Sequence, residues 1–387
     1  MGVPGTVNTI LALSLLFCQS SQKPFELADG DRVVFIGNTF FERDLKHNHL
    51  ETALTLRWPT RNVTFRNLGW DGDTVWGDAR AEFGSPADGF NSLAKHVADL
   101  KPNVIFVAYG FSESFAGPAG VSPFTQQLDK MLDMLSRTQA RLILLSPIRH
   151  EDLGRPLPDP AEHNLSLQLY VDAIAKVAAR RSYDYINLFD LVGSKERPLT
   201  ENGIHLNDRG YRAATWTIER SLGLPSLTWE VSLEGRGKSI SVGTTIGSIE
   251  GSSEGGKAAL QDVTLPGGPR TFRAPLLAGA GRYTLKIDGV AVADATSEEW
   301  AKGVTLAKGP EFDQLEKLRG LIEEKNRHYF HYWRPQNDTY IFGFRRKEQG
   351  HLSAEFPKFP PILNEKDAEI AKLRVPAAHS YVLERAR

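Results

Sequence analysis

The sequence has little cysteine, no excess of basic residues and no long apolar run. Its 387 residues include one cysteine, Cys18, which excludes an intrachain disulfide and a cluster of thiolate metal ligands. Lysine and arginine total 46 against 47 aspartates and glutamates, so the chain lacks the basic excess typical of nucleic-acid-binding proteins. No apolar run reaches the ~20 residues that a membrane-spanning helix requires. We therefore expect neither a nucleic-acid partner nor a membrane span.

What is present is the composition of a folded, globular protein. Apolar residues make up 41% of the chain and charged residues 24%, which excludes a wholly disordered polypeptide. At about 150 residues per domain, the length indicates two domains or one domain with large insertions.

The first 22 residues differ from the rest because they carry no charged side chain. The apolar run Ile10–Phe17 has the length of a signal-peptide core. We expect residues 1–22 to be a cleaved signal peptide and the protein to be exported, to the periplasm or beyond. No basic residue precedes the run, so an apolar leader on a cytosolic protein stays open as the alternative.

Residues 23–223 alternate between apolar runs and amphipathic segments. The runs predict buried strands at residues 32–37, 63–67, 104–109, 141–146 and 183–188. The segments between and after them predict helices at residues 42–58, 87–100, 125–137, 165–181 and 209–222. This alternation predicts a flavodoxin-like, three-layer α/β/α fold with a mostly parallel five-stranded sheet.

The remaining chain has a different character. Residues 224–308 alternate polar and apolar side chains between frequent glycine-rich turns, which predicts a small antiparallel β module. Residues 309–387 are predicted to form a helical and aromatic C-terminal segment that packs on the main domain. The aromatic residues within 329–344 either form that packing seam or wall a sugar or acyl pocket.

Polar segments follow the predicted strands, at the edge of a parallel sheet where ligands bind. Gly37-Asn38-Thr39 follows the first strand, Gly69 the second, and Gly110-Phe111-Ser112-Glu113 the third. Asn202-Gly203-Ile204-His205 precedes the last helix. In this order the segments resemble the four sequence blocks of the SGNH (GDSL-like) hydrolases, in particular secreted bacterial esterases, over residues 29–222.

The resemblance implies the SGNH hydrolase fold and a serine-hydrolase-like mechanism without cofactor or metal. Thr39 stands at the position of the nucleophile, His205 at that of the general base, and Asn202 at that of the acid that orients the base. A hydroxyl needs such a base, since it is a poor nucleophile while it keeps its proton.

The resemblance also implies a set of groups that bind the substrate and its oxyanion. The backbone N–H groups of Thr39 and Gly69 and the side chain of Ser112 are the implied oxyanion donors, with Asn38 and Glu113 beside them. The sequence departs from the family pattern, because Thr39 replaces serine, Asn202 replaces aspartate and Ser112 replaces asparagine.

Two functions are therefore weighed. The first is an ester hydrolase that acts on a small-molecule or glycan ester, such as an O-acyl group of a carbohydrate. The second is a catalytically impaired relative that binds a glycan or a protein partner in the same cleft. Further alternatives are a carboxylate pair at Asp71 and Asp73, a metal site formed by these two residues and His205, and a role in the site for His150.

Overall fold

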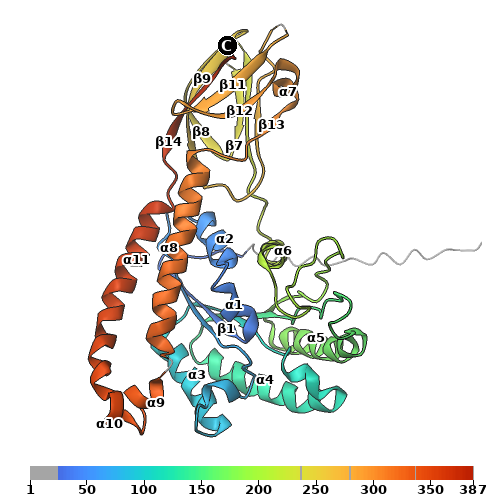
Figure 1. Ribbon diagram of the computed structural model, residues 1–387, viewed down its shortest axis with the longest axis vertical. Coiled ribbons are helices and arrows are strands. Elements are labelled where there is room, and N and C mark those ends of the chain that lie inside the picture. Colours follow the sequence, from blue (N-terminus) through green and yellow to red (C-terminus); the bar gives the residue numbers. More distant parts are fainter. Residues whose placement is uncertain (1–24, 236–237, 279, 336, 387) are drawn as a thin grey trace, which may run out of the picture.

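The computed structural model describes residues 25–235, 238–278, 280–335 and 337–386. The predicted signal peptide, residues 1–22, lies outside these residues. Figure 1 shows an α/β unit and a β-rich unit that are joined along one side by two long helices. We call residues 25–223 the α/β domain, and residues 229–305 together with 378–385 the β module.

The α/β domain is built on one parallel sheet. Its strands are ordered β2-β1-β3-β4-β5, with bounds β1 (Arg32–Gly37), β2 (Thr64–Gly69), β3 (Val104–Ala108), β4 (Arg141–Leu145) and β5 (Asp184–Ile186). Alternate residues of β1 point to opposite faces: Val34 and Ile36 join one core cluster, and Val33 and Phe35 join the other. Both faces are therefore buried, which confirms the predicted three-layer α/β/α architecture.

Helices cover the two faces of this sheet in two groups. Apolar residues of α3 (Pro86–Leu100), α4 (Val121–Ser136) and α5 (Ala161–Arg181) pack on one face. Those of α1 (Thr39–Asp44), α2 (His49–Arg57) and α6 (Asp208–Ser221) pack on the other. Short 3₁₀ helices complete the loops: η1 (Asp78–Arg80), η2 (Glu113–Ala116) and η3 (Pro118–Gly120).

One predicted helix is wrong, because residues 42–58 form parts of α1 and α2 and not a single helix. The break lies at Asn48, whose backbone is left-handed with φ 53°. Asparagine tolerates this conformation better than most residues, and its side-chain amide donates to Leu45 O at 2.9 Å, which caps the turn.

The β module consists of two sheets that face each other across one apolar core. The first has the order β13-β10-β6-β7 and the second β12-β11-β14-β9-β8. All neighbouring strands are antiparallel except β10 and β6, which are parallel. The elements are β6 (Trp229–Gly235), β7 (Lys238–Val242), β8 (Thr244–Ser252), β9 (Gly255–Asp262), β10 (Arg270–Arg273), β11 (Arg282–Ile287), β12 (Val290–Thr296), α7 (Ser297–Lys302), β13 (Val304–Thr305) and β14 (Ala378–Arg385).

The C-terminal segment connects the two units. Helix α8 (Pro310–Trp333) runs from the β module along the α/β domain, and α11 (Phe359–Leu373) lies beside it (Figure 1). Between them lie α9 (Asp338–Ile341), α10 (Arg346–Gln349) and η4 (Gly350–Lys358). Tyr329 and Trp333 are buried in the core of the α/β domain, so these two rings form a packing seam. Strand β14 then returns to the β module between β9 and β11, which the sequence analysis did not predict.

Within the described residues, the structure contains no helix whose length and apolar character would let it cross a membrane.

Candidate active site

A cavity of about 370 Å³ lies at the carboxyl edge of the parallel sheet. Residues that follow β1, β3 and β4 form part of its wall, as does the loop that precedes α6. Polar groups on the wall include Thr39, Ser112 and His205. Most of the wall is apolar, through Phe40, Phe111, Phe115, Ile148, Ile204 and Leu206. The structure thus brings together the predicted hydroxyl, the predicted imidazole and a binding surface for an apolar group.

Thr39 is the first residue of α1, immediately beyond the end of β1. The preceding Asn38 is buried and caps the helix, because its Oδ1 accepts from Phe40 N at 3.2 Å. The backbone N–H of Asn38 donates to Ala108 O at 3.2 Å. Asn38 therefore holds the nucleophile position in place, while its side-chain oxygen is already committed to the cap.

The backbone N–H of Gly69, the predicted oxyanion donor, is already hydrogen-bonded within the protein. Its N–H donates to the Asn67 side-chain oxygen at 2.8 Å in a buried position, so it is not available to a substrate. Gly72 lines the cavity instead, and its N–H points at Thr39 Oγ1 over 3.4 Å. Gly69 belongs to β2, which ends two residues later than residues 63–67 predict. The loop after β2 therefore starts later than predicted, and Gly72, not Gly69, is the glycine of this segment that lies at the cavity.

Ser112 and Glu113 have different environments although they are adjacent. Ser112 lines the cavity. Glu113 is buried and accepts from Val75 N at 2.8 Å and from Gly110 N at 2.9 Å. Burial raises the pKa of Glu113 to about 7, although these hydrogen bonds oppose the rise. Glu113 therefore joins two loops beneath the cavity, and Ser112 is the member of the pair that can contact a ligand.

Asn202 determines which nitrogen of His205 carries the proton. Its side-chain oxygen accepts from two groups that can only donate, the backbone N–H groups of Ile204 at 3.3 Å and of His205 at 3.0 Å. The remaining NH₂ group faces His205 Nδ1 at 3.1 Å and must donate to it. The neutral ring therefore carries its proton on Nε2.

The electrostatic surroundings keep His205 neutral. Burial lowers the pKa of His205, and the positive charge of Arg43 lowers it further, against an opposing effect of Asp71. Both Thr39 and His205 line the cavity, but in the described part of the chain no hydrogen bond joins their side chains.

The predicted alternatives at Asp71 and Asp73 do not form a pair. Asp73 is fully buried and accepts from Arg80 Nε at 2.6 Å and from the Tyr109 hydroxyl at 2.9 Å. Asp71 lies at 3.9 Å from Arg43 Nε on a more exposed side. Each carboxylate contacts its own arginine, and neither belongs to a group of three close ligand side chains among the described residues.

His150 is part of a buried chain that the sequence analysis missed. Its Nδ1 contacts His163 Nδ1 at 3.0 Å, and His163 Nε2 contacts Ser114 Oγ at 2.9 Å. The Ser114 hydroxyl donates to Phe111 O at 2.6 Å, so its proton is committed to a carbonyl. His150 is not among the described residues that line the cavity. This chain therefore supports the cavity wall and does not supply a second nucleophile.

Comparisons with known proteins agree with the observed fold. Residues 37–213 match the model of the GDSL-like lipase/acylhydrolase family. The solved structure of a gut microbial diltiazem-metabolizing enzyme is similar over 93% of this chain and 99% of its own, with a TM-score of 0.73 and 14% identity. At this identity the likeness concerns the fold, and it includes the β module and the C-terminal helices.

Two further structures match about half of this chain. An acetylxylan esterase from Geobacillus stearothermophilus covers 52% of this chain and 98% of its own at 13% identity, with a TM-score of 0.41. A GDSL-like lipase from Bacteroides thetaiotaomicron covers 50% and 88% at 18% identity, with a TM-score of 0.37. No curated protein matches the chain by sequence. Residues 37–213, just under half of this chain, thus match the GDSL-like lipase/acylhydrolase family model, and they contain the sequence blocks and the parallel sheet described above.

Proposed function

We propose that this protein hydrolyses esters in the cavity at the carboxyl edge of the sheet, with Thr39 as nucleophile and His205 as general base. The observation that supports this most is the shared cavity wall, which holds Thr39, Gly72, Ser112 and His205 although they come from four separate segments of the chain. A hydroxyl, an imidazole and amide donors around one cavity are the groups that acyl transfer requires.

In the proposed reaction, Thr39 Oγ1 attacks the ester carbonyl carbon as His205 Nε2 takes the hydroxyl proton. The carbonyl oxygen becomes an oxyanion, and the N–H of Gly72 and the hydroxyl of Ser112 donate to it. The bond to the alcohol then breaks, and the alcohol leaves with the proton from His205. Water, deprotonated by the same imidazole, hydrolyses the acyl group from Thr39.

One contact opposes this reaction and sets its expected rate. The base must present an unprotonated Nε2, whereas the Asn202 amide at 3.1 Å favours the ring with its proton there. In a serine protease the equivalent aspartate-to-asparagine change costs about 10⁴-fold in rate. The methyl group of Thr39 adds crowding at the nucleophile. We therefore expect a slow hydrolase.

The same contact favours a second candidate function, ligand binding without turnover. With the proton on Nε2, His205 can donate to a carbonyl or carboxylate oxygen in the cavity, beside the hydroxyl of Ser112. A glycan or a protein partner that carries such a group is the corresponding ligand.

The cavity wall indicates how the two halves of the ester would bind. Phe40, Phe111 and Phe115 suit an apolar acyl group. For the alcohol we propose a carbohydrate. Trp70, two residues before Gly72 in the sequence, lines a second cavity. This cavity is also lined by the rings of Phe330 and Tyr340 and by polar side chains such as Asn337. Rings and amides together suit a sugar, which has both apolar faces and hydroxyl groups.

The test is the initial rate of hydrolysis of p-nitrophenyl acetate, p-nitrophenyl butyrate and an acetylated xylooligosaccharide. We expect Thr39→Val and His205→Ala to reduce kcat by about 10²-fold or more. Thr60→Val and His351→Ala change an exposed threonine and an exposed histidine, and are expected to retain the wild-type rate.

Ester hydrolysis that survives both substitutions at Thr39 and His205 contradicts the proposed function. No hydrolysis by the wild type, together with saturable binding of the same oligosaccharide that His205→Ala abolishes, supports the second candidate.

A further inference from the structure

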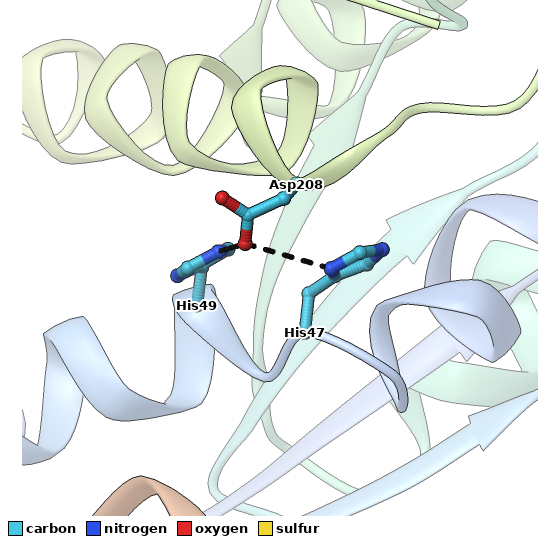
Figure 2. A group of neighbouring side chains, drawn as sticks. All are labelled: His47, His49 and Asp208. Atoms are coloured by element: carbon cyan, nitrogen blue, oxygen red, sulfur yellow. Dashed lines mark hydrogen bonds and ion pairs between the residues drawn. The ribbon is translucent and has the colours of Figure 1, made fainter. Parts of the chain in front are cut away.

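Two histidines and an aspartate from distant parts of the chain meet next to the cavity wall. Figure 2 shows His47 and His49 on either side of the carboxylate of Asp208. One ring nitrogen of His47, one ring nitrogen of His49 and a carboxylate oxygen of Asp208 lie within 4.8 Å of one another. Asp208 Oδ1 is 2.7 Å from His49 Nε2 and 3.7 Å from His47 Nδ1. Among the described residues, no other group of three such side chains is this close.

The backbone holds the two histidines in fixed positions. His47 lies in the turn between α1 and α2, and His49 is the first residue of α2. Between them Asn48 is buried and left-handed. Its Oδ1 accepts from Asn326 Nδ2 of α8 at 2.7 Å, which ties the turn to a third element. A site on such rigid elements is already organised before it binds anything.

The carboxylate is oriented by its second oxygen. Asp208 is the first residue of α6, and its Oδ2 accepts from Arg212 Nε at 2.9 Å, one turn along the same helix. This leaves Oδ1 facing the two imidazoles. The ring of His47 also stacks on Tyr211 with a centroid distance of 4.9 Å, which fixes its plane. Such outer contacts are typical of groups that ligate metals.

The donor set indicates the kind of ion. Two imidazole nitrogens and one carboxylate oxygen suit Zn²⁺ and similar transition metals, whereas Ca²⁺ and Mg²⁺ prefer oxygen alone. A tetrahedral zinc with bonds of about 2.0–2.1 Å separates its ligand atoms by about 3.4 Å. The distances of 2.7 and 3.7 Å bracket this value. The side chain of Asp208 is 54% exposed, so solvent can reach the site and fill a fourth position.

We propose that His47, His49 and Asp208 bind one divalent transition metal ion, Zn²⁺ by preference. Arg212 and Arg319 lie close enough to repel a cation. The expected affinity is therefore lower than that of a four-ligand structural zinc site.

The position of the site gives the ion a structural role. Thr39 begins α1, which leads into the turn with His47, and His205 precedes Asp208 by three residues. An ion that joins this turn to the start of α6 therefore ties together the two segments that carry the proposed nucleophile and base.

The chain offers a matched control, a second histidine–aspartate pair that belongs to no group of three close ligand side chains among the residues that the structure describes. His379 Nδ1 lies 2.7 Å from Asp288 Oδ2 in the β module. The His49–Asp208 and His379–Asp288 pairs have the same separation of 2.7 Å. If the His49–Asp208 contact is only an ordinary hydrogen bond, substitutions in the two pairs should have the same effect on Zn²⁺ binding.

The experiment uses the full chain after removal of metals by a chelator. Zn²⁺ is titrated by calorimetry, and Co²⁺ is added to a second sample to record its visible absorption. We expect one Zn²⁺ per chain, a tetrahedral Co²⁺ spectrum and a higher Tm in the presence of Zn²⁺. His47→Phe keeps the stacked ring but removes the ligand, and Asp208→Asn keeps a polar group at the start of α6. Each variant should weaken Zn²⁺ binding by at least about tenfold and abolish the Co²⁺ spectrum, whereas His379→Ala should bind as the wild type does.

Two results would overturn the proposal. One is a wild type that binds no stoichiometric Zn²⁺. The other is a His47→Phe or Asp208→Asn variant that is folded by circular dichroism and binds Zn²⁺ as tightly as the wild type.

Discussion

At the scale of single residues, the contact between Asn202 and His205 controls how reactive the site is. An asparagine can satisfy the two backbone N–H groups of the loop as well as an aspartate can, so the loop keeps its shape. However, the Asn202 NH₂ group that faces the imidazole cannot accept a hydrogen bond from a protonated Nδ1. Residue 202 can therefore change the reactivity of His205 without changing the conformation of this loop.

This separation predicts a gain of activity from Asn202→Asp. An aspartate would accept from His205 Nδ1–H, which leaves Nε2 free as a base and stabilises the imidazolium that forms. We expect kcat for ester hydrolysis to rise by at least about tenfold, and by up to about 10⁴-fold. The added negative charge should also raise the pKa of His205, so the acid limb of the pH–rate profile should move to higher pH. A folded Asn202→Asp variant with an unchanged rate and profile would contradict the inferred tautomer.

Residue identity alone predicted only part of the site. The sequence placed Thr39, Ser112 and His205 on one cavity because their segments follow parallel strands or precede the last helix, and the structure has them there. The sequence pattern pointed to Gly69 and not to Gly72 as the backbone donor. The reason is that the length of β2 depends on its pairing with β1, which hydrophobic periodicity does not reveal. The proposed metal site at His47, His49 and Asp208 was missed because Asp208 lies 159 residues beyond His49 and the three residues follow no motif.

At the scale of elements, apolar runs identified all five strands of the parallel sheet, since a strand that is buried on both faces has few alternatives. The split between α1 and α2 was not predictable from apolar spacing, because Asn48 breaks the helix through its own backbone conformation. Strand β14 was missed for another reason. It is held by pairing with β9 and β11, which lie far away in sequence.

The contact between α3 and α8 predicts a pH dependence of stability. His96 on α3 meets Trp333 on α8 edge to face, with a centroid distance of 5.4 Å. Burial lowers the pKa of His96 to about 4, and the charge of Arg80 contributes. Below its ordinary pKa near 6.5 the unfolded chain binds a proton that the folded chain excludes, so stability falls as pH falls from 6.5 towards 4.

The measurement compares the wild type with His96→Phe, which keeps an aromatic ring against Trp333. We expect the wild type to lose about 2–3 kcal/mol more than the variant between pH 7 and pH 4 in urea unfolding. Equal losses in the two proteins would show that His96 is not buried in its neutral form.

At the scale of the whole molecule, a buried polar cluster fastens α8 to the α/β domain. Lys325 Nζ forms an ion pair with Glu51 and donates to Phe65 O at 3.1 Å. Asn326 Nδ2 donates to Glu51 Oε2 at 2.7 Å. All four groups are buried, and α8 continues from there to the β module (Figure 1). The cluster therefore fixes the helix that links the two units.

Removal of one charge from this cluster should be costly. Lys325→Met leaves Glu51 buried without its cation, and we expect the free energy of unfolding to fall by about 3–5 kcal/mol. Lys95→Met breaks the exposed pair with Asp99, which should cost less than about 1 kcal/mol. Chemical denaturation of both variants measures the difference. Similar losses in the two variants would argue against a fastening role for Lys325.

The most direct test of the account is covalent labelling by a fluorophosphonate probe, which phosphonylates a hydroxyl that a neighbouring base activates and releases fluoride. Mass spectrometry of the digested protein locates the label. The account predicts a label on Thr39 in the wild type, more of it in Asn202→Asp, and none in His205→Ala. A label on Ser112 or another residue, or no label in a wild type that hydrolyses esters, would contradict the assignment of Thr39 as the nucleophile.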